Sequence, residues 1–154
     1  MSGSEYIKHI RSKIGNSILL IPSVGAVILN EKNELLLQEK NDNTWSLPAG
    51  MIEPNETPKE AIIREAQEET GLIVEPVTVL GVFGGGDFNY TYPNNNEVGY
   101  TIILMLCSVK SESGEILDSE TKSLKYFSKE AMPKLALPYP KEVLFNECKT
   151  TYIA

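Results

Sequence analysis

The sequence is poor in cysteine, histidine and positive charge. It has two cysteines and one histidine among 154 residues, too few for a structural zinc site or a disulfide framework. Such sparse cysteine is typical of the reducing cytoplasm. The 21 Asp and Glu residues outnumber the 14 Lys and Arg residues, and the formal net charge is -7 at pH 7. This acidity argues against nucleic acid or an anionic membrane as the main partner, although a bound cation can reverse the charge locally.

Long apolar runs are also absent. The most apolar stretches, residues 18–29 and 100–109, are too short to cross a bilayer, and Pro22 interrupts the first. The N-terminal residues lack the apolar core of a signal peptide. We therefore expect a soluble cytoplasmic protein, and the length predicts a single domain over residues 1–154.

The hydrophobic spacing predicts helices and strands in a mixed order. Apolar residues at helical spacing predict a short amphipathic helix in an N-terminal extension, residues 1–16, which packs on the domain or on a second subunit of a homodimer. Further helices are predicted over 128–135 and 138–148, and a polar turn joins the first two strands into a hairpin. Strands are predicted over 23–30, 34–40, 44–48, 72–83, 98–110 and 124–128. This order predicts an α+β fold, a mixed β-sheet sandwiched between α-helices.

Capping signals delimit one further helix, over residues 58–70. Thr57 is a good N-cap, Pro58 suits the first helical position, and Glu60 completes a capping box three residues after Thr57. Gly71 is the expected C-cap. These signals predict both ends of the helix.

The same helix gathers like charge on one face. At about 100° per residue, Glu65, Glu68 and Glu69 lie side by side next to an apolar face, with Arg64 four residues before Glu68. Neighbouring carboxylates repel each other. Either water screens a solvated face, or a cation lies among the carboxylates. Oxygen ligands on a rigid backbone suit Mg²⁺ or Mn²⁺.

The flanking spacing favours the cation. A glycine is followed after five residues by Glu, and after seven more by Arg-Glu, then Glu-Glu and Gly. This spacing resembles the Nudix box, here residues 50–72, and departs from it at Ala66, where a larger aliphatic residue is usual. The matching residues are Gly50, Glu56, Arg64, Glu65, Glu68, Glu69 and Gly71.

The resemblance implies a fold, a reaction and a cofactor. The Nudix fold is a mixed sheet between helices. Its members are generally divalent-metal-dependent pyrophosphohydrolases that cleave the diphosphate of a nucleoside diphosphate linked to another moiety. The implied substrate is a nucleotide sugar, a dinucleoside polyphosphate or a (d)NTP, and the implied cofactor is Mg²⁺ or Mn²⁺. The alternative is a Nudix-fold module that senses a nucleotide without cleaving it, but such modules usually lose the box carboxylates that this sequence keeps.

The resemblance also implies roles for individual residues. Glu65, Glu68, Glu69 and the carbonyl of Ala49 are implied to hold the cations. Glu65 and Glu68 are also candidate catalytic residues, and Arg64 is implied to orient the catalytic glutamate. The implied site therefore combines acidic metal ligands with one arginine that binds no metal.

Three box residues have implied supporting roles. Glu56 steadies the helix and the loop before it, and Gly50 and Gly71 serve the turns. Gly50 is also a candidate substrate-binding position, since a side chain there is expected to obstruct the substrate.

The general base is expected in one of two places. It is either a box glutamate or a glutamate in the loop over residues 111–123, which offers Glu112, Glu115 and Glu120. Glu120 stands nearest the following strand and is our choice. An exposed loop glutamate with no catalytic role is the alternative.

Substrate contacts are expected outside the box, in the Gly- and Asn-rich loop over residues 84–97. Phe88, Tyr90 and Tyr92 alternate there, and Phe88 and Tyr90 are candidates to stack on a base; ordinary packing is the alternative. Tyr90 stands eighteen residues after the box, as in dinucleoside polyphosphate hydrolases. The proline common at about this distance in ADP-ribose-type members is absent.

Overall fold

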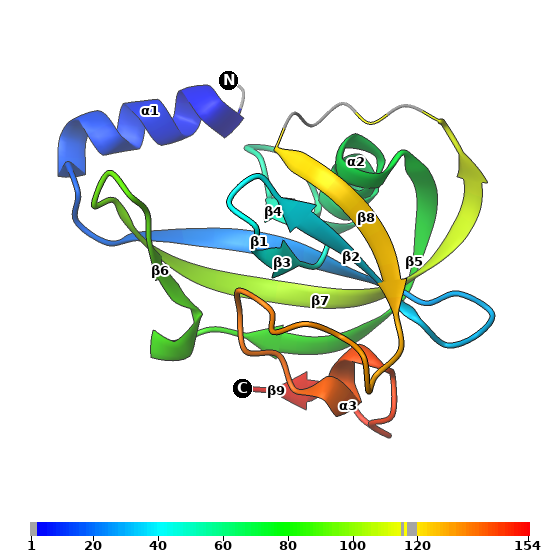
Figure 1. Ribbon diagram of the computed structural model, residues 1–154. Helices are drawn as coiled ribbons and strands as arrows, with labels where there is room; N and C mark the ends of the chain where they lie inside the picture. The colour runs from blue at the N-terminus through cyan, green and yellow to red at the C-terminus, as the bar shows by residue number, and fades with distance from the viewer. Residues whose placement is uncertain (1–2, 115, 117–119) are drawn as a thin grey trace.

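Two β-sheets form the body of the computed structural model, which describes residues 3–114, 116 and 120–154 (Figure 1). The larger sheet has the order β4-β1-β7-β5-β9, with β6 paired to β7, and the smaller has the order β3-β2-β8. The larger sheet contains β1 (Leu19–Ile28), β4 (Ala49–Met51), β5 (Leu72–Phe83), β6 (Asn89–Thr91), β7 (Glu97–Glu112) and β9 (Tyr152–Ile153). The smaller sheet contains β2 (Leu35–Lys40), β3 (Trp45–Ser46) and β8 (Thr121–Phe127). The helices are α1 (Gly3–Ile14), α2 (Pro58–Thr70) and α3 (Lys141–Leu144), with a 3₁₀ turn at η1 (Gly86–Phe88).

The longest strand, β7, lies at the centre of the larger sheet. It runs parallel to β1 and antiparallel to β5 and β6, so the sheet is mixed. Its inward side chains Val98, Ile102 and Leu104 are buried, as expected for a strand with neighbours on both edges. The α+β class with a central mixed sheet is therefore confirmed.

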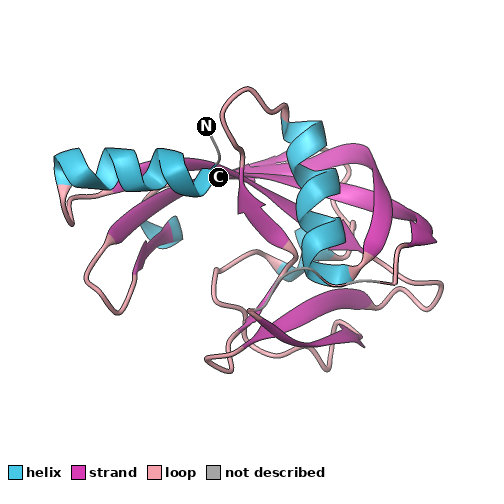
Figure 2. Cartoon of the chain, turned by 90° about the horizontal axis from the view of Figure 1, so that it is seen from above, coloured by secondary structure: helices cyan, strands magenta, loops and turns pink. Residues whose placement is uncertain are grey.

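The two faces of the larger sheet are covered differently (Figure 2). On one face, α2 buries Ile62 against a core that contains Val24 of β1. On the other face, the smaller sheet and α3 form a second core with Leu37, Leu104 and Leu144. One long helix and a sheet with a four-residue helix therefore enclose the larger sheet.

The predicted hairpin near the N-terminus is only partly correct. β1 and β2 meet at an antiparallel bridge between Leu29 and Leu35. Beyond that bridge, β1 continues in the larger sheet and β2 in the smaller. The connection therefore links two sheets.

Of the two helices predicted near the C-terminus, the first is absent and the second is shorter than predicted. Residues 128–135 contain turns, because Pro133 removes a backbone donor and clashes with a preceding helical turn. The helix predicted over 138–148 shortens to α3, and Asn146 beyond it has a positive φ of 55°. The chain then turns back, and β9 pairs in parallel with β5.

The predicted N-terminal helix is present as α1 and lies at one end of the molecule (Figure 1). Its first residue, Gly3, is buried against Met51 and Glu53, so closely that an added Cβ would lie 2.9 Å from both Glu53 Oε1 and Met51 Cε. Its last turn is held by Arg11, whose Nη2 donates to the carbonyl of Glu97 at 2.6 Å. The helix therefore spans from the loop after β4 to the start of β7.

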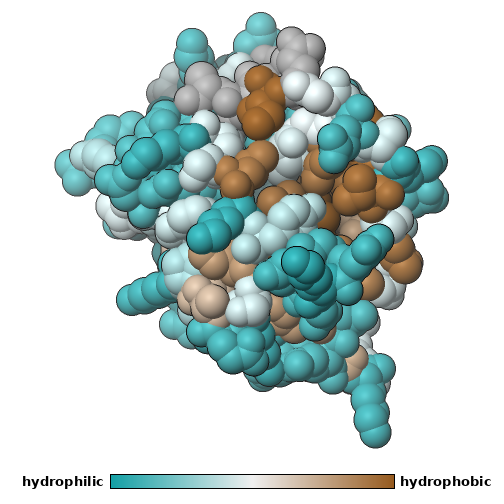
Figure 3. All heavy atoms as spheres, turned by 45° about the vertical axis from the view of Figure 1, so that its right-hand side comes forward, coloured by the Kyte–Doolittle hydropathy of each residue, from teal (hydrophilic) through white to brown (hydrophobic). Residues whose placement is uncertain are grey.

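Apolar side chains reach the surface as patches among polar ones (Figure 3). The exposed apolar residues include Val77, Val109 and Ile116. None of the described helices is both long enough and apolar enough to cross a bilayer.

Candidate active site

The helix α2 has fixed ends. The Thr57 hydroxyl accepts from the backbone N–H of Glu60 at 3.1 Å, and the Glu60 carboxylate accepts from the N–H of Thr57 at 2.8 Å. Gly71 closes the helix with a φ of 73°, a left-handed conformation that favours glycine. Both predicted caps are confirmed. They hold in place the carboxylates that α2 carries.

Arg64 binds the loop before the helix. Its Nε and Nη2 donate to the two carboxylate oxygens of Glu56 at 2.7 and 2.9 Å, and Nη2 also donates to the Met51 carbonyl at 3.0 Å. The hydrogen bonds from Arg64 lower the pKa of Glu56, and those to Glu56 raise the pKa of Arg64. This paired, two-bond geometry ties the loop after β4 to α2.

Arg64 also separates two carboxylates of the helix. Its Nη1 donates to Glu65 Oε1 at 2.8 Å and to Glu68 Oε2 at 3.3 Å. The Glu65 side chain is 14% exposed and that of Glu68 is 40% exposed. A positive group therefore lies between these like charges, and Glu68 is the more accessible of the two carboxylates.

Gly50 leaves room for one of these carboxylates. A Cβ at Gly50 would lie 2.1 Å from Glu65 Oε1 and 2.5 Å from Glu65 Oε2, far inside van der Waals contact. The group that a side chain at Gly50 would displace is therefore the Glu65 carboxylate. This contact explains the glycine without reference to a substrate.

Glu69 differs from its neighbours because it is buried, with 4% of its surface exposed. Its Oε2 accepts from Gln38 Nε2 at 2.8 Å and from the N–H of Ala49 at 2.9 Å, and its Oε1 lies 3.6 Å from Lys40 Nζ. Burial raises the pKa of Glu69 to about 8, while Lys40 opposes the rise and the nearby Glu65 adds to it. Burial therefore disfavours the ionised form of this carboxylate, and Lys40 together with the two hydrogen bonds favours it.

The residues present fit a divalent cation in their chemistry. They offer oxygen donors on a capped helix, as Mg²⁺ and Mn²⁺ prefer, and a buried negative charge that a cation stabilises. Within residues 3–114, 116 and 120–154, no three His, Cys, Asp or Glu side chains already converge on one point. Arg64 and Lys40 bind the carboxylates instead.

The loop glutamate chosen as the base lies at the end of the smaller sheet. Glu120 is exposed, and its carbonyl accepts from the N–H of Asn41 at 3.2 Å. It directly precedes Thr121, whose hydroxyl donates to Gln38 Oε1 at 2.8 Å. Thr121, the residue after Glu120, is therefore linked to Glu69 by two successive hydrogen bonds that pass through Gln38. Glu115 lies outside the described residues.

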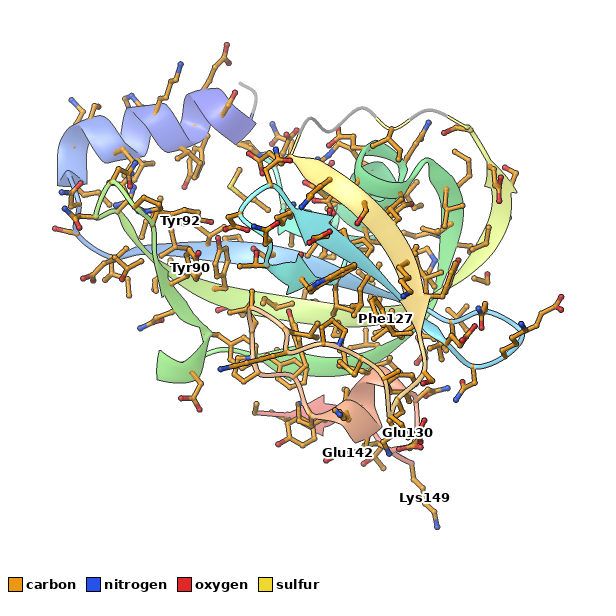
Figure 4. All side chains as sticks on the ribbon, viewed as in Figure 1. Tyr90, Tyr92, Phe127, Glu130, Glu142 and Lys149 are labelled. Atoms are coloured by element: carbon orange, nitrogen blue, oxygen red, sulfur yellow. The ribbon has the colours of Figure 1, made fainter. Side chains whose placement is uncertain are left out.

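The aromatic residues of the loop do not share one side. Phe88 is 4% exposed and packs on Phe83 and Tyr139 in the core, so its ring offers no stacking surface to a ligand and that expectation is corrected. Tyr90 and Tyr92 contact each other with ring centroids 4.8 Å apart, and both lie beneath α1 in Figure 4. The strand alternation fails because Phe88 belongs to η1, not to β6.

Gln38 and Lys40 were not among the residues expected at the site. Both belong to β2, and with Ala49, Ser46 and Tyr139 they line a cavity of about 100 Å³ beside Glu69. The Ser46 hydroxyl is buried and makes no hydrogen bond to a described residue. A glutamine inside the apolar run of β2 was the signal that could have indicated a buried polar partner.

Comparison with known proteins identifies the family. The family model for the NUDIX domain matches residues 19–146, and the chain therefore belongs to the Nudix hydrolases, which generally use divalent metals. The chain is 30% identical over 122 residues to an ADP-ribose pyrophosphatase of Methanocaldococcus jannaschii, covering 77% of this chain and 68% of that protein.

A further relative and a solved structure are also similar to the chain. The chain is 54% identical to the 8-oxo-dGDP phosphatase NUDT18 of Mus musculus over 61 residues, which are 37% of this chain and 19% of that protein. The crystal structure of an ADP-ribose pyrophosphatase from Streptococcus suis superposes with a TM-score of 0.69 at 26% identity, covering 87% of this chain and 98% of that one.

Proposed function

We propose that the chain is an Mg²⁺- or Mn²⁺-dependent pyrophosphohydrolase that cleaves the diphosphate of a nucleoside diphosphate linked to another moiety. The observation that carries the proposal is the buried Glu69 beside Glu65 and Glu68 on one capped helix. A buried carboxylate is costly unless it is paired. Lys40 supplies one positive charge beside Glu69, and a divalent cation would offset the negative charge that the three neighbouring carboxylates still carry.

Four groups would hold the cations: the carboxylates of Glu65, Glu68 and Glu69 and the carbonyl of Ala49. When bound, divalent cations screen the diphosphate oxygens and lower the pKa of the attacking water. Displacement at phosphorus depends mainly on positioning and charge neutralisation. Arg64 would keep the box loop and two of these carboxylates in register through its contacts with Glu56, Glu65 and Glu68.

The proton of the attacking water requires a carboxylate base. Glu68 suits this role because its carboxylate is more accessible than those of Glu65 and Glu69. Glu120 is the second candidate, since it joins the strand whose first residue binds Gln38. Replacing each by Gln in turn and comparing single-turnover rates assigns the base.

A nucleotide sugar of the ADP-ribose type is the substrate that we propose first. Two relatives that align over most of this chain are named ADP-ribose pyrophosphatases. The half-buried Tyr90 can offer its ring to a base. A dinucleoside polyphosphate and a (d)NTP are the alternatives, and the local likeness to an 8-oxo-dGDP phosphatase supports including oxidised nucleotides in a screen.

A substrate panel tests the proposed function. The full chain is incubated with ADP-ribose, diadenosine tetraphosphate, dGTP and 8-oxo-dGDP in Mg²⁺, in Mn²⁺ and with EDTA, and the products are separated by chromatography. We expect turnover of at least one compound, its loss with EDTA and its recovery on adding excess metal. Tight metal-independent binding without any turnover would instead identify a nucleotide sensor.

A further inference from the structure

Gln38 is a fully buried amide with all its hydrogen-bonding groups engaged. It is 1% exposed, and its Nε2 donates to the Leu47 carbonyl at 3.1 Å and to Glu69 Oε2 at 2.8 Å. Its Oε1 accepts from Thr121 Oγ1 at 2.8 Å. An amide in an apolar strand is costly without such partners, so the contacts explain how β2 tolerates it.

The partners determine which way the amide points. The Leu47 carbonyl accepts only, and so does an ionised Glu69 carboxylate, so both must face the NH₂ group of Gln38. The oxygen of Gln38 therefore faces Thr121, whose hydroxyl must donate. Thr121, Gln38 and Glu69 thus form a directed chain of hydrogen bonds that ends on one carboxylate oxygen.

That chain leaves the two oxygens of Glu69 in different situations. Oε2 accepts from both Gln38 and the N–H of Ala49. Oε1 faces the ammonium group of Lys40 at 3.6 Å. One oxygen is held by neutral donors and the other faces a cation.

We propose that Gln38, itself held by Thr121, is a positioning residue that locks Glu69 and presents Oε1 to the divalent cation. This inference rests on the proposed function, since it concerns the same carboxylate. Partners that orient a metal ligand commonly contribute 10–100-fold to metal affinity. Here the partner comes from β2, outside the box.

The same contact joins the smaller sheet to the box. Thr121 is the first residue of β8, and Glu120 before it is tied to the turn after β2 by the hydrogen bond from Asn41. The position of Gln38 therefore sets both Glu69 and the strand end that carries Glu120. Loss of Gln38 should loosen the two together.

Gln38→Leu tests the proposal directly, because leucine suits the apolar run of β2. Mn²⁺ is titrated calorimetrically into the full chain without substrate. We expect Mn²⁺ binding to weaken about 10–100-fold relative to wild type. Gln67→Leu is the matched control, since it makes the same chemical change on α2 at a side chain with no hydrogen bond to a described residue, and it should bind Mn²⁺ as wild type does.

A pair of substitutions at Thr121 tests the series of hydrogen bonds from Thr121 to Glu69 without altering Gln38. Thr121→Val keeps the shape and removes the hydroxyl, and should weaken Mn²⁺ binding about 2–10-fold, as expected for one hydrogen bond. Thr121→Ser keeps the hydroxyl and should restore binding to within about twofold of wild type. If Gln38→Leu does not fold, this pair decides the proposal.

Kinetics separate positioning from a general loss of structure. In Gln38→Leu the Mg²⁺ concentration for half-maximal rate should rise about 10–100-fold, while the KM for nucleotide at saturating Mg²⁺ changes by less than about twofold. Equal Mn²⁺ affinity in wild type, Gln38→Leu and Thr121→Val overturns the positioning role alone. A wild-type chain that binds Mn²⁺ but hydrolyses no compound of the panel overturns the proposed enzymatic function instead.

Discussion

Two helices of nearly equal length, α1 and α2, have opposite relations to the rest of the molecule. α2 packs on the larger sheet, is capped at both ends and carries a buried carboxylate, Glu69. In α1, among its residues Gly3–Ile14, burial is confined to Gly3. Its hold on the body comes from its two ends, at Gly3 and at Arg11.

The difference follows from the charged side chains that each helix carries. Neighbouring carboxylates must keep their spacing against mutual repulsion, and those of α2 are held by packing, by the helix caps and by Arg64. α1 presents half-buried apolar residues, and its Arg11 donates to three backbone carbonyls at the end of the helix. We therefore expect substitutions around α2 to abolish activity and substitutions in α1 to have small effects.

The largest effect should come from Glu69→Gln. The amide keeps the shape and removes the charge, so kcat/KM should fall by more than about 100-fold, beyond what is lost with an outer partner of a metal ligand. The fold should persist, because burial opposes the charged form of Glu69. Steady-state rates and thermal unfolding measured on the same preparation check both statements. A Glu69→Gln variant with the full wild-type rate would show that the Glu69 carboxylate is not part of the active site.

Gly50→Ala should come next. The added Cβ would lie 2.1 Å from Glu65 Oε1, so the carboxylate must move by more than an ångström, and a displacement of that size costs about 100-fold in rate. Glycine at position 86, where a Cβ meets nothing within 4 Å, provides the control substitution Gly86→Ala. Similar rates for both alanine variants would contradict the steric explanation.

Arg64→Lys should mainly reduce stability. Lysine cannot reproduce the paired bonds to Glu56, and we expect a loss of about 2 kcal/mol in the free energy of unfolding at pH 7, measured in urea.

The loss should depend on pH in one direction. Arg64 lowers the pKa of Glu56 below its ordinary value of 4.5, so in the wild type this pair stabilises the folded state above the unfolded-state pKa. That contribution disappears as the pH falls through the lower, folded-state pKa. The difference between wild type and Arg64→Lys should therefore shrink on acidification, and a constant difference down to pH 3 would exclude the pair as its source.

The smallest effect should follow Arg11→Ala. The contacts of Arg11 lie at the exposed end of α1, so we expect a loss of about 0.5–1 kcal/mol and rates within about twofold of wild type. Hydrogen exchange should quicken in α1 and stay unchanged in α2. A large drop in rate would show that α1 contributes to the site and would end the contrast between the helices.

Some features of this protein were determined by the sequence alone. The spacing between Gly50 and Gly71 identified α2, both of its caps and the family, because capping and motif chemistry depend on neighbours within a few residues. The central strand β7 was likewise evident from its apolar run.

Other features were decided only by the tertiary structure. Glu65, Glu68 and Glu69 look alike in sequence, yet Glu69 is buried against Gln38 and Lys40, Glu65 lies over Gly50 and Glu68 is partly exposed. Phe88 likewise becomes a core residue only through its tertiary contacts with Phe83 and Tyr139. Burial and long-range hydrogen bonds depend on how β2, β4 and α2 come together in space, and residues 31 positions apart in the chain, as Gln38 and Glu69 are, carry no local signal of their contact.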